Sequence, residues 1–116
     1  MASPTSRMPN AYKVLGQSDL PATTLTDVYT VPASTETVIS TIIIANRTAS
    51  GESFRIAIRP NGATISDEHY IAYGVPIGAN DSTTLTLGIT LDAADVLSVY
   101  ASAVDLSVNV FGTEIS

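Results

Sequence analysis

The chain has no cysteine, no tryptophan and a single lysine, Lys13, among its 116 residues. Without cysteine it can form neither disulfide bonds nor a thiolate zinc site. Acidic residues outnumber basic residues by eleven to five, which gives a formal net charge of −6 at pH 7. Nucleic acids and anionic membranes both require a basic surface, so we expect neither of them as a partner.

Charged residues of either sign are scarce, at 14% of the sequence against about 25% in an ordinary globular protein. Hydrophobic residues make up 45%, which excludes a disordered chain. A folded domain with so few charges must present a surface rich in serine, threonine, asparagine and alanine. Such a surface suits a protein packed against partners, although a monomer kept soluble by its hydroxyl groups is the alternative.

No segment repeats its hydrophobic residues at a helical period over three turns, whereas several short segments favour strands. The longest β-branched run, residues 37–46, is apolar on both faces and predicts a strand in the middle of a sheet. Strict alternation predicts Val38, Ile42 and Ile44 on one face of this strand, and Ile39 and Ile43 on the other.

Shorter segments with turn residues between them predict an all-β fold, an antiparallel β-sandwich of about eight strands. A jelly roll and an immunoglobulin-like Greek key both fit, because nothing in the sequence fixes the strand order. We expect residues 1–10 to form an N-terminal arm and residues 11–116 to form one sandwich domain. The expected strands cover residues 11–15 (closed by Gly16), 25–31, 37–46, 53–59, 69–75, 83–91, 96–101 and 106–111, with a loop at 17–23.

The sequence contains little that would support a catalytic site. The only histidine, His69, follows Ser66 and Asp67 so closely on one extended segment that the three cannot converge as a hydrolytic triad. Neither zinc nor calcium ligand spacing is present. We therefore expect no catalytic, cofactor or metal site. The five tyrosines favour half-buried positions at sheet edges or subunit contacts over a stacking platform for sugars or bases.

Two features point to protein–protein contact. Arg55 and Arg59 project from the same face of one predicted strand, about 13 Å apart, and either pair with carboxylates of the chain or meet an acidic partner. Residues 106–111 carry no charge and no proline, so we expect an unguarded edge strand that an assembly covers. The predicted interface comprises Arg7 of the arm, Arg55, Arg59, Leu106, Val108 and Val110.

Several segments resemble small virion proteins of tailed bacteriophages, and cyanophages in particular. They are AYKVLGQ at 11–17, YTVPA at 29–33, IIANR at 43–47, HYIAY at 69–73 and LTLGITL at 85–91, so the likeness runs over most of the chain. The family brings no catalytic residues. The arm is not a feature of this resemblance.

The resemblance implies a non-enzymatic structural protein located in the virion, in the first place a decoration or cement subunit that binds the major capsid protein. A subunit of the tail, neck, baseplate or fibre is the alternative, and a glycan-binding module is a third. The low charge, the expected edge strand and the arm together predict a homo-oligomer, a trimer in the first instance.

Overall fold

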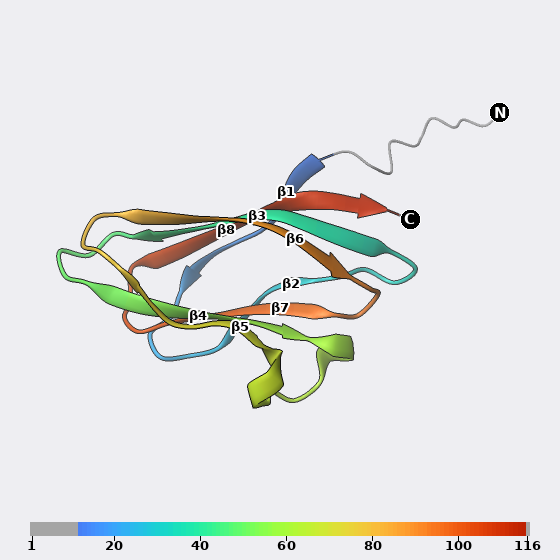
Figure 1. Ribbon diagram of the computed structural model, residues 1–116, viewed down its shortest axis with the longest axis horizontal. Coiled ribbons are helices and arrows are strands. Elements are labelled where there is room, and N and C mark those ends of the chain that lie inside the picture. Colours follow the sequence, from blue (N-terminus) through green and yellow to red (C-terminus); the bar gives the residue numbers. More distant parts are fainter. Residues whose placement is uncertain (1–11, 116) are drawn as a thin grey trace.

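The computed structural model describes residues 12–115, which form eight β-strands joined by short turns (Figure 1). Within this part of the chain no helix is long and apolar enough to cross a membrane. The expected arm, residues 1–10 with Arg7, lies outside the described residues. The strands are β1 (Tyr12–Leu20), β2 (Thr26–Thr30), β3 (Glu36–Asn46), β4 (Glu52–Arg59), β5 (Tyr70–Ile77), β6 (Ser82–Leu91), β7 (Val96–Ala101) and β8 (Leu106–Ile115), with 3-10 turns η2 (Pro60–Gly62) and η3 (Asp67–His69).

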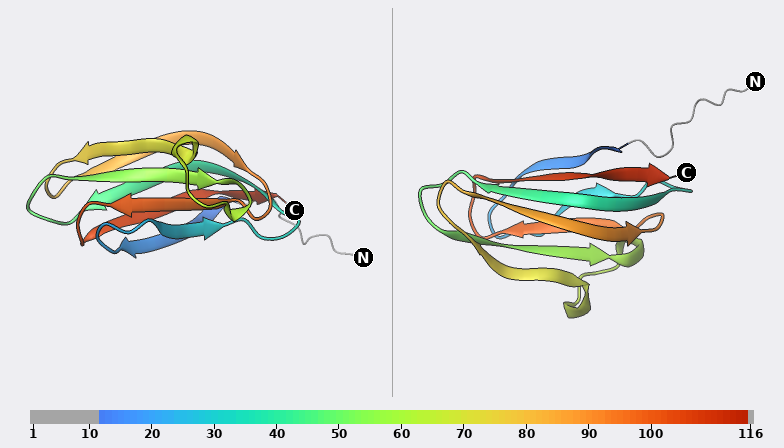
Figure 2. Two further views of the ribbon diagram at one scale, coloured as in Figure 1. Left: turned by 90° about the horizontal axis from the view of Figure 1, so that it is seen from below. Right: turned by 45° about the horizontal axis from the view of Figure 1, so that its top comes forward.

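The strands form two four-stranded sheets that pack face to face, as the views in Figure 2 show. Sheet 1 has the order β1-β8-β3-β6 and sheet 2 the order β2-β7-β4-β5, and the paired strands within each are antiparallel. The predicted antiparallel sandwich is therefore confirmed. Of the two topologies that the sequence allowed, this order is that of an eight-stranded jelly roll.

The core lies between the sheets and is built from the inward residues of every strand. Phe54 and Ile56 of β4 are fully buried, as are Leu97 and Val99 of β7. Sheet 1 contributes Leu20, Ile39, Ile42, Ile44, Leu91, Leu106, Val108 and Val110. Because successive strand side chains point to opposite faces, this one apolar layer leaves the outer face of each sheet to solvent or to a partner.

The strand β3 is central in sheet 1, as predicted, but its alternation is broken. The register with β8 shifts between Ile39 and Thr41, so Ser40 is an extra residue on β3. Consequently Ile39 points inward together with Ile42 and Ile44, and Val38 lies on the half-exposed side. The face predicted from strict alternation was wrong for Ile39 and Val38, because a β-bulge exchanges the two faces beyond it.

The first strand also continues further than predicted. Gly16 was expected to end this strand, but β1 continues to Leu20. The first four residues of the predicted loop at 17–23 therefore belong to the strand. Gly16 faces inward, where an added Cβ would lie 2.5 Å from the carbonyl oxygen of Val28. The glycine therefore serves the close approach of β1 and β2 and does not mark a turn.

The last strand, β8, corrects the predicted edge. It lies between β1 and β3, so it is interior to sheet 1. Leu106, Val108 and Val110 are fully buried in the core and are not available as surface contacts. An uncharged strand is equally expected in a sheet interior, and the sequence pattern alone did not distinguish the two positions.

Candidate functional site

The two predicted contact arginines have different surroundings. Arg59 pairs with Asp27 of β2 at 2.6 Å and donates to the hydroxyl of Ser98 at 3.2 Å. It also donates to the carbonyl oxygens of Gly62 and Ala63, and its side chain is only 15% exposed. Arg59 thus ties β4 to β2 and to the η2 turn within the chain, which leaves little of it for a partner.

Arg55 lies on the same outer face of sheet 2, between two aromatic rings. Its guanidinium carbon is 4.2 Å from the ring centroids of both Tyr73 and Tyr100. Tyr70 packs edge-on against Tyr73, with the centroids 5.0 Å apart and the planes at 89°. Arg55, Tyr70, Tyr73 and Tyr100 together are called the Arg55 cluster, which spans β7, β4 and β5.

The sheet register explains why these residues meet. Arg55 is the cross-strand partner of Tyr100 in the regular β4–β7 ladder. On the other side, the β4–β5 register shifts between Phe54 and Ile56, which leaves Tyr73 beside Arg55. Each ring contact is worth about 0.5–2 kcal/mol, depending on how far the cation is desolvated. The rings therefore fix a long side chain that would otherwise sample many rotamers.

Arg55 has no carboxylate partner, which distinguishes it from every other lysine and arginine in residues 12–115. Lys13 pairs with Glu114 at 2.6 Å, Arg47 with Asp19 at 2.6 Å, and Arg59 with Asp27. Two aromatic rings flank the Arg55 guanidinium, and its N–H groups form no hydrogen bond with residues 12–115, so they are available to a partner. That geometry suits a carboxylate, which guanidinium binds through two parallel hydrogen bonds.

The sequence pointed to Arg55 but not to its aromatic neighbours. Tyr100 could have been inferred only from a known β4–β7 register, and Tyr73 only from the register shift in β5. The exposure of the cluster is uneven: Tyr73 is 61% exposed, whereas Arg55, Tyr70 and Tyr100 are partly buried. Next to the cluster, Ile71 of β5 is 50% exposed. Three of the five tyrosines thus gather at one place on sheet 2, whereas Tyr29 is buried in the core and Tyr12 is exposed on β1 of sheet 1.

A second cluster of titratable groups lies between the sheets. The hydroxyl of Tyr29 donates to Glu114 at 2.6 Å and lies 2.7 Å from the Thr37 hydroxyl, and Glu114 also binds Lys13. Burial, reinforced by the Glu114 hydrogen bond, raises the pKa of Tyr29 to about 12. The hydrogen bonds from Lys13 and Tyr29 lower the pKa of Glu114. These groups join β1, β2, β3 and β8. Their polar atoms form hydrogen bonds and an ion pair with one another.

Alkaline pH should destabilise the fold through Tyr29. Its proton is held more tightly in the folded state than in the unfolded state, so the stabilisation is complete below pH 10 and is lost as the pH rises toward 12. We expect the free energy of unfolding to fall by about 2–3 kcal/mol across this window, and Tyr29→Phe to remove that slope. Urea unfolding at several pH values measures it; an equal slope in the variant would contradict the assignment.

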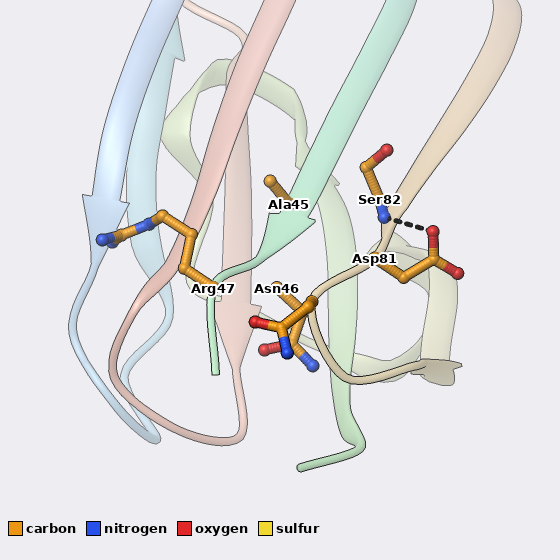
Figure 3. Close-up of a pocket in the computed structure, with 6 residues that line it drawn as sticks. Ala45, Asn46, Arg47, Asp81 and Ser82 are labelled. Carbon is orange, nitrogen blue, oxygen red and sulfur yellow. Dashed lines mark hydrogen bonds between the residues drawn. The ribbon is translucent and has the colours of Figure 1, made fainter. Parts of the chain in front are cut away.

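An open pocket of about 390 Å³ lies at the end of β3 and the start of β6 (Figure 3). Figure 3 shows the Arg47 side chain pointing away from Asp81, toward β1, where it pairs with Asp19. The Asn46 amide is fully engaged: it donates to three carbonyl oxygens and accepts two hydrogen bonds from Thr48. The pocket is lined by Ala45, Asn46, Arg47, Asn80, Asp81 and Ser82. The Asn46 amide at its centre is used to hold the surrounding loops together.

The segment around His69 is a turn. The backbone N–H of Ser66 donates to His69 Nδ1 at 3.1 Å, which closes η3 locally and directs the imidazole to the backbone instead of to a nucleophile. Among residues 12–115 no group of three or more histidines and carboxylates could hold a metal ion. Among the side-chain clusters in the part of the chain that the structure describes, the Arg55 cluster is thus the one with hydrogen-bond donors available to a partner.

Comparison of the chain with protein-family models, with curated proteins and with solved structures finds no match.

Proposed function

We propose that the protein is a non-enzymatic structural subunit of a tailed-phage particle, and that it decorates or cements the capsid. The Arg55 cluster is the observation that carries the proposal. It is a preorganised cation on an exposed sheet face, flanked by tyrosines and without a counter-ion in residues 12–115. Tyrosine and arginine are the residues that most often dominate protein–protein contacts.

The surroundings of Arg55 agree with docking onto an acidic surface. Tyr73 and Ile71 add exposed apolar area, and the guanidinium edge provides directional donors for a carboxylate of the partner. A small sandwich that repeats such a modest contact many times on a symmetric shell is held by multivalency. The resemblance of several segments to small virion proteins, and the use of jelly rolls in viral capsid proteins, support this role, although a fold alone does not fix a function.

The copy number in purified particles tests the proposal. If the chain decorates the capsid of the phage that encodes it, quantitative mass spectrometry of purified particles should find hundreds of copies. A count of six to a few dozen would indicate the alternative role, a subunit of the tail, neck, baseplate or fibre. Its absence from particles would overturn the proposal.

Arg55→Gln should weaken docking at least about ten-fold, because it removes the charge and the fork of donors while keeping a side chain between the rings. The measurement is binding of purified protein to particles stripped of it. Arg47→Gln is the matched control, because it changes the net charge equally but breaks only exposed ion pairs, those with Asp19 and Asp105.

Arg55→Lys should restore only part of the binding, because an ammonium cannot form the bidentate contact. Thermal unfolding of each variant verifies that the sandwich is intact. Equal binding by Arg55→Gln and by the parent protein would remove the cluster from the docking surface.

A further inference from the structure

The strand β6 is an exposed sheet edge without the usual protection. Among residues 12–115 it ends sheet 1 and pairs only with β3. Its ten residues, Ser82–Leu91, include no charged residue and no proline. An antiparallel edge strand directs half of its backbone N–H and C=O groups away from its neighbour, so β6 offers a ready template for another strand.

The other three edges are guarded. β1 carries Lys13 and Asp19 and has a register shift at Leu15. β2 has only five residues, one of them Asp27, and is shifted as well. β5 contains Pro76 and two register shifts. These are the devices by which natural sheets prevent edge-to-edge pairing, and β6 has only one of them, a shift opposite Ser40.

The outer face of sheet 1, which continues from β6, carries few charges, namely Asp19 on β1 and Glu36 at the start of β3. The cross-strand rows place Thr86 and Thr84 of β6 beside Thr41 and Ile43 of β3. These two β3 residues lie in turn beside Phe111 and Asn109 of β8. Four rows run across β1, β8, β3 and β6 in that order: Tyr12–Thr113–Val38–Thr90, Val14–Phe111–Thr41–Thr86, Gln17–Asn109–Ile43–Thr84 and Asp19–Ser107–Ala45–Ser82. The one charged residue in these four rows is Asp19, which lies on β1 at the edge of the sheet opposite β6.

We propose that β6 pairs antiparallel with β6 of a second copy, so that the two sheets 1 form one continuous eight-stranded sheet. Each chain has a net charge of −6, so two copies repel one another unless they meet where carboxylates are absent. The uncharged β6 edge and its threonine rows meet that condition. The contact is isologous and therefore gives a two-fold dimer, in place of the trimer expected from the sequence.

The regular half of β6 determines where the two-fold axis lies. Residues 82–86 pair with β3 without interruption, whereas the register shift follows Thr86. Thr84, at the middle of this stretch, has an exposed side chain on the outer face. With the axis near Thr84, this residue and its symmetry mate are cross-strand neighbours, whose side chains interact directly.

A charge exchange at Thr84 tests the pairing. Sedimentation equilibrium of the parent protein should show a reversible monomer–dimer equilibrium. Thr84→Lys and Thr84→Glu should each weaken the dimer at least ten-fold, since like charges then oppose one another across the axis. An equimolar mixture of the two variants should restore a dimer. The matched control is Thr30→Lys, which places the same charge on the exposed, short edge strand β2.

Three results would overturn the proposal: a parent protein that stays monomeric at several hundred micromolar, a dimer that survives both single variants, or a mixture that fails to restore it. Circular dichroism and thermal unfolding of each variant exclude misfolding as the cause. If the parent protein is monomeric but the Thr84 variants are lost from particles, the edge serves a strand of another protein. The dimer is measured on the isolated protein, so its outcome is independent of the copy number that tests the proposed function.

Discussion

Gly112→Ala is expected to prevent stable folding, with a loss of more than about 4 kcal/mol in the free energy of unfolding. Gly112 lies on β8 opposite Ile39 of β3. A Cβ at this position would overlap the carbonyl oxygen of Val38, and it would lie 3.0 Å from the Cα of Ile39 and 2.9 Å from Leu15 Cδ1. Two of these obstacles are backbone atoms of a central strand, so they cannot rotate aside as a flexible side chain would.

Gly88→Ala is the control for this experiment. Gly88 lies on β6 at the shifted part of its pairing with β3, and an added Cβ would meet no atom within 4 Å. We expect its effect to stay within about 0.5 kcal/mol. Urea unfolding followed by circular dichroism measures both variants, and equal midpoints for Gly112→Ala and the parent protein would show that β3 and β8 can separate without cost.

Asn46→Asp, which preserves the shape of the side chain, should cost about 3–5 kcal/mol. Asn46 is 2% exposed, and its Nδ2 donates to the carbonyl oxygens of Ser50, Ile77 and Gly78 at 2.9, 3.3 and 3.1 Å. The substitution replaces these donated hydrogen bonds by a carboxylate oxygen that faces three acceptors. Because it disconnects the loop after β3 from the end of β5, we expect loss of cooperative unfolding at that end of the sandwich.

The matched control is Asn80→Asp in the same pocket. Asn80 is exposed and has a positive φ of 53°, a conformation that aspartate also tolerates. The control should change the unfolding free energy by no more than a few tenths of a kcal/mol. The cost of Asn46→Asp should also shrink at acidic pH, where the carboxyl group is neutral and can donate one hydrogen bond. A pH-independent cost equal to that of the control would disprove the structural role of the amide.

The sequence by itself determined the class of fold and the place of most strands. Alternation over residues 53–59 and 83–91 predicted β4 and β6 within one residue of their observed starts. The turn at Pro60–Gly62 likewise follows from local sequence, because proline and Asn-Gly favour the backbone angles found there, with φ of 54° at Asn61 and 69° at Gly62. These features depend on neighbours in the chain, and a local pattern can therefore report them.

Only the tertiary structure decided the strand order, the bulges and the partners of the side chains. The extra residue at Ser40 exchanged the faces of β3, and no local signal marks it. Whether β8 or β6 forms an edge depends on pairings between segments far apart in the sequence, and residues 106–111 and 82–91 both lack charge. The Arg55 cluster joins Tyr73, Arg55 and Tyr100 from three strands. Its geometry is set by cross-strand register, which is a property of the assembled sheet and not of any one segment.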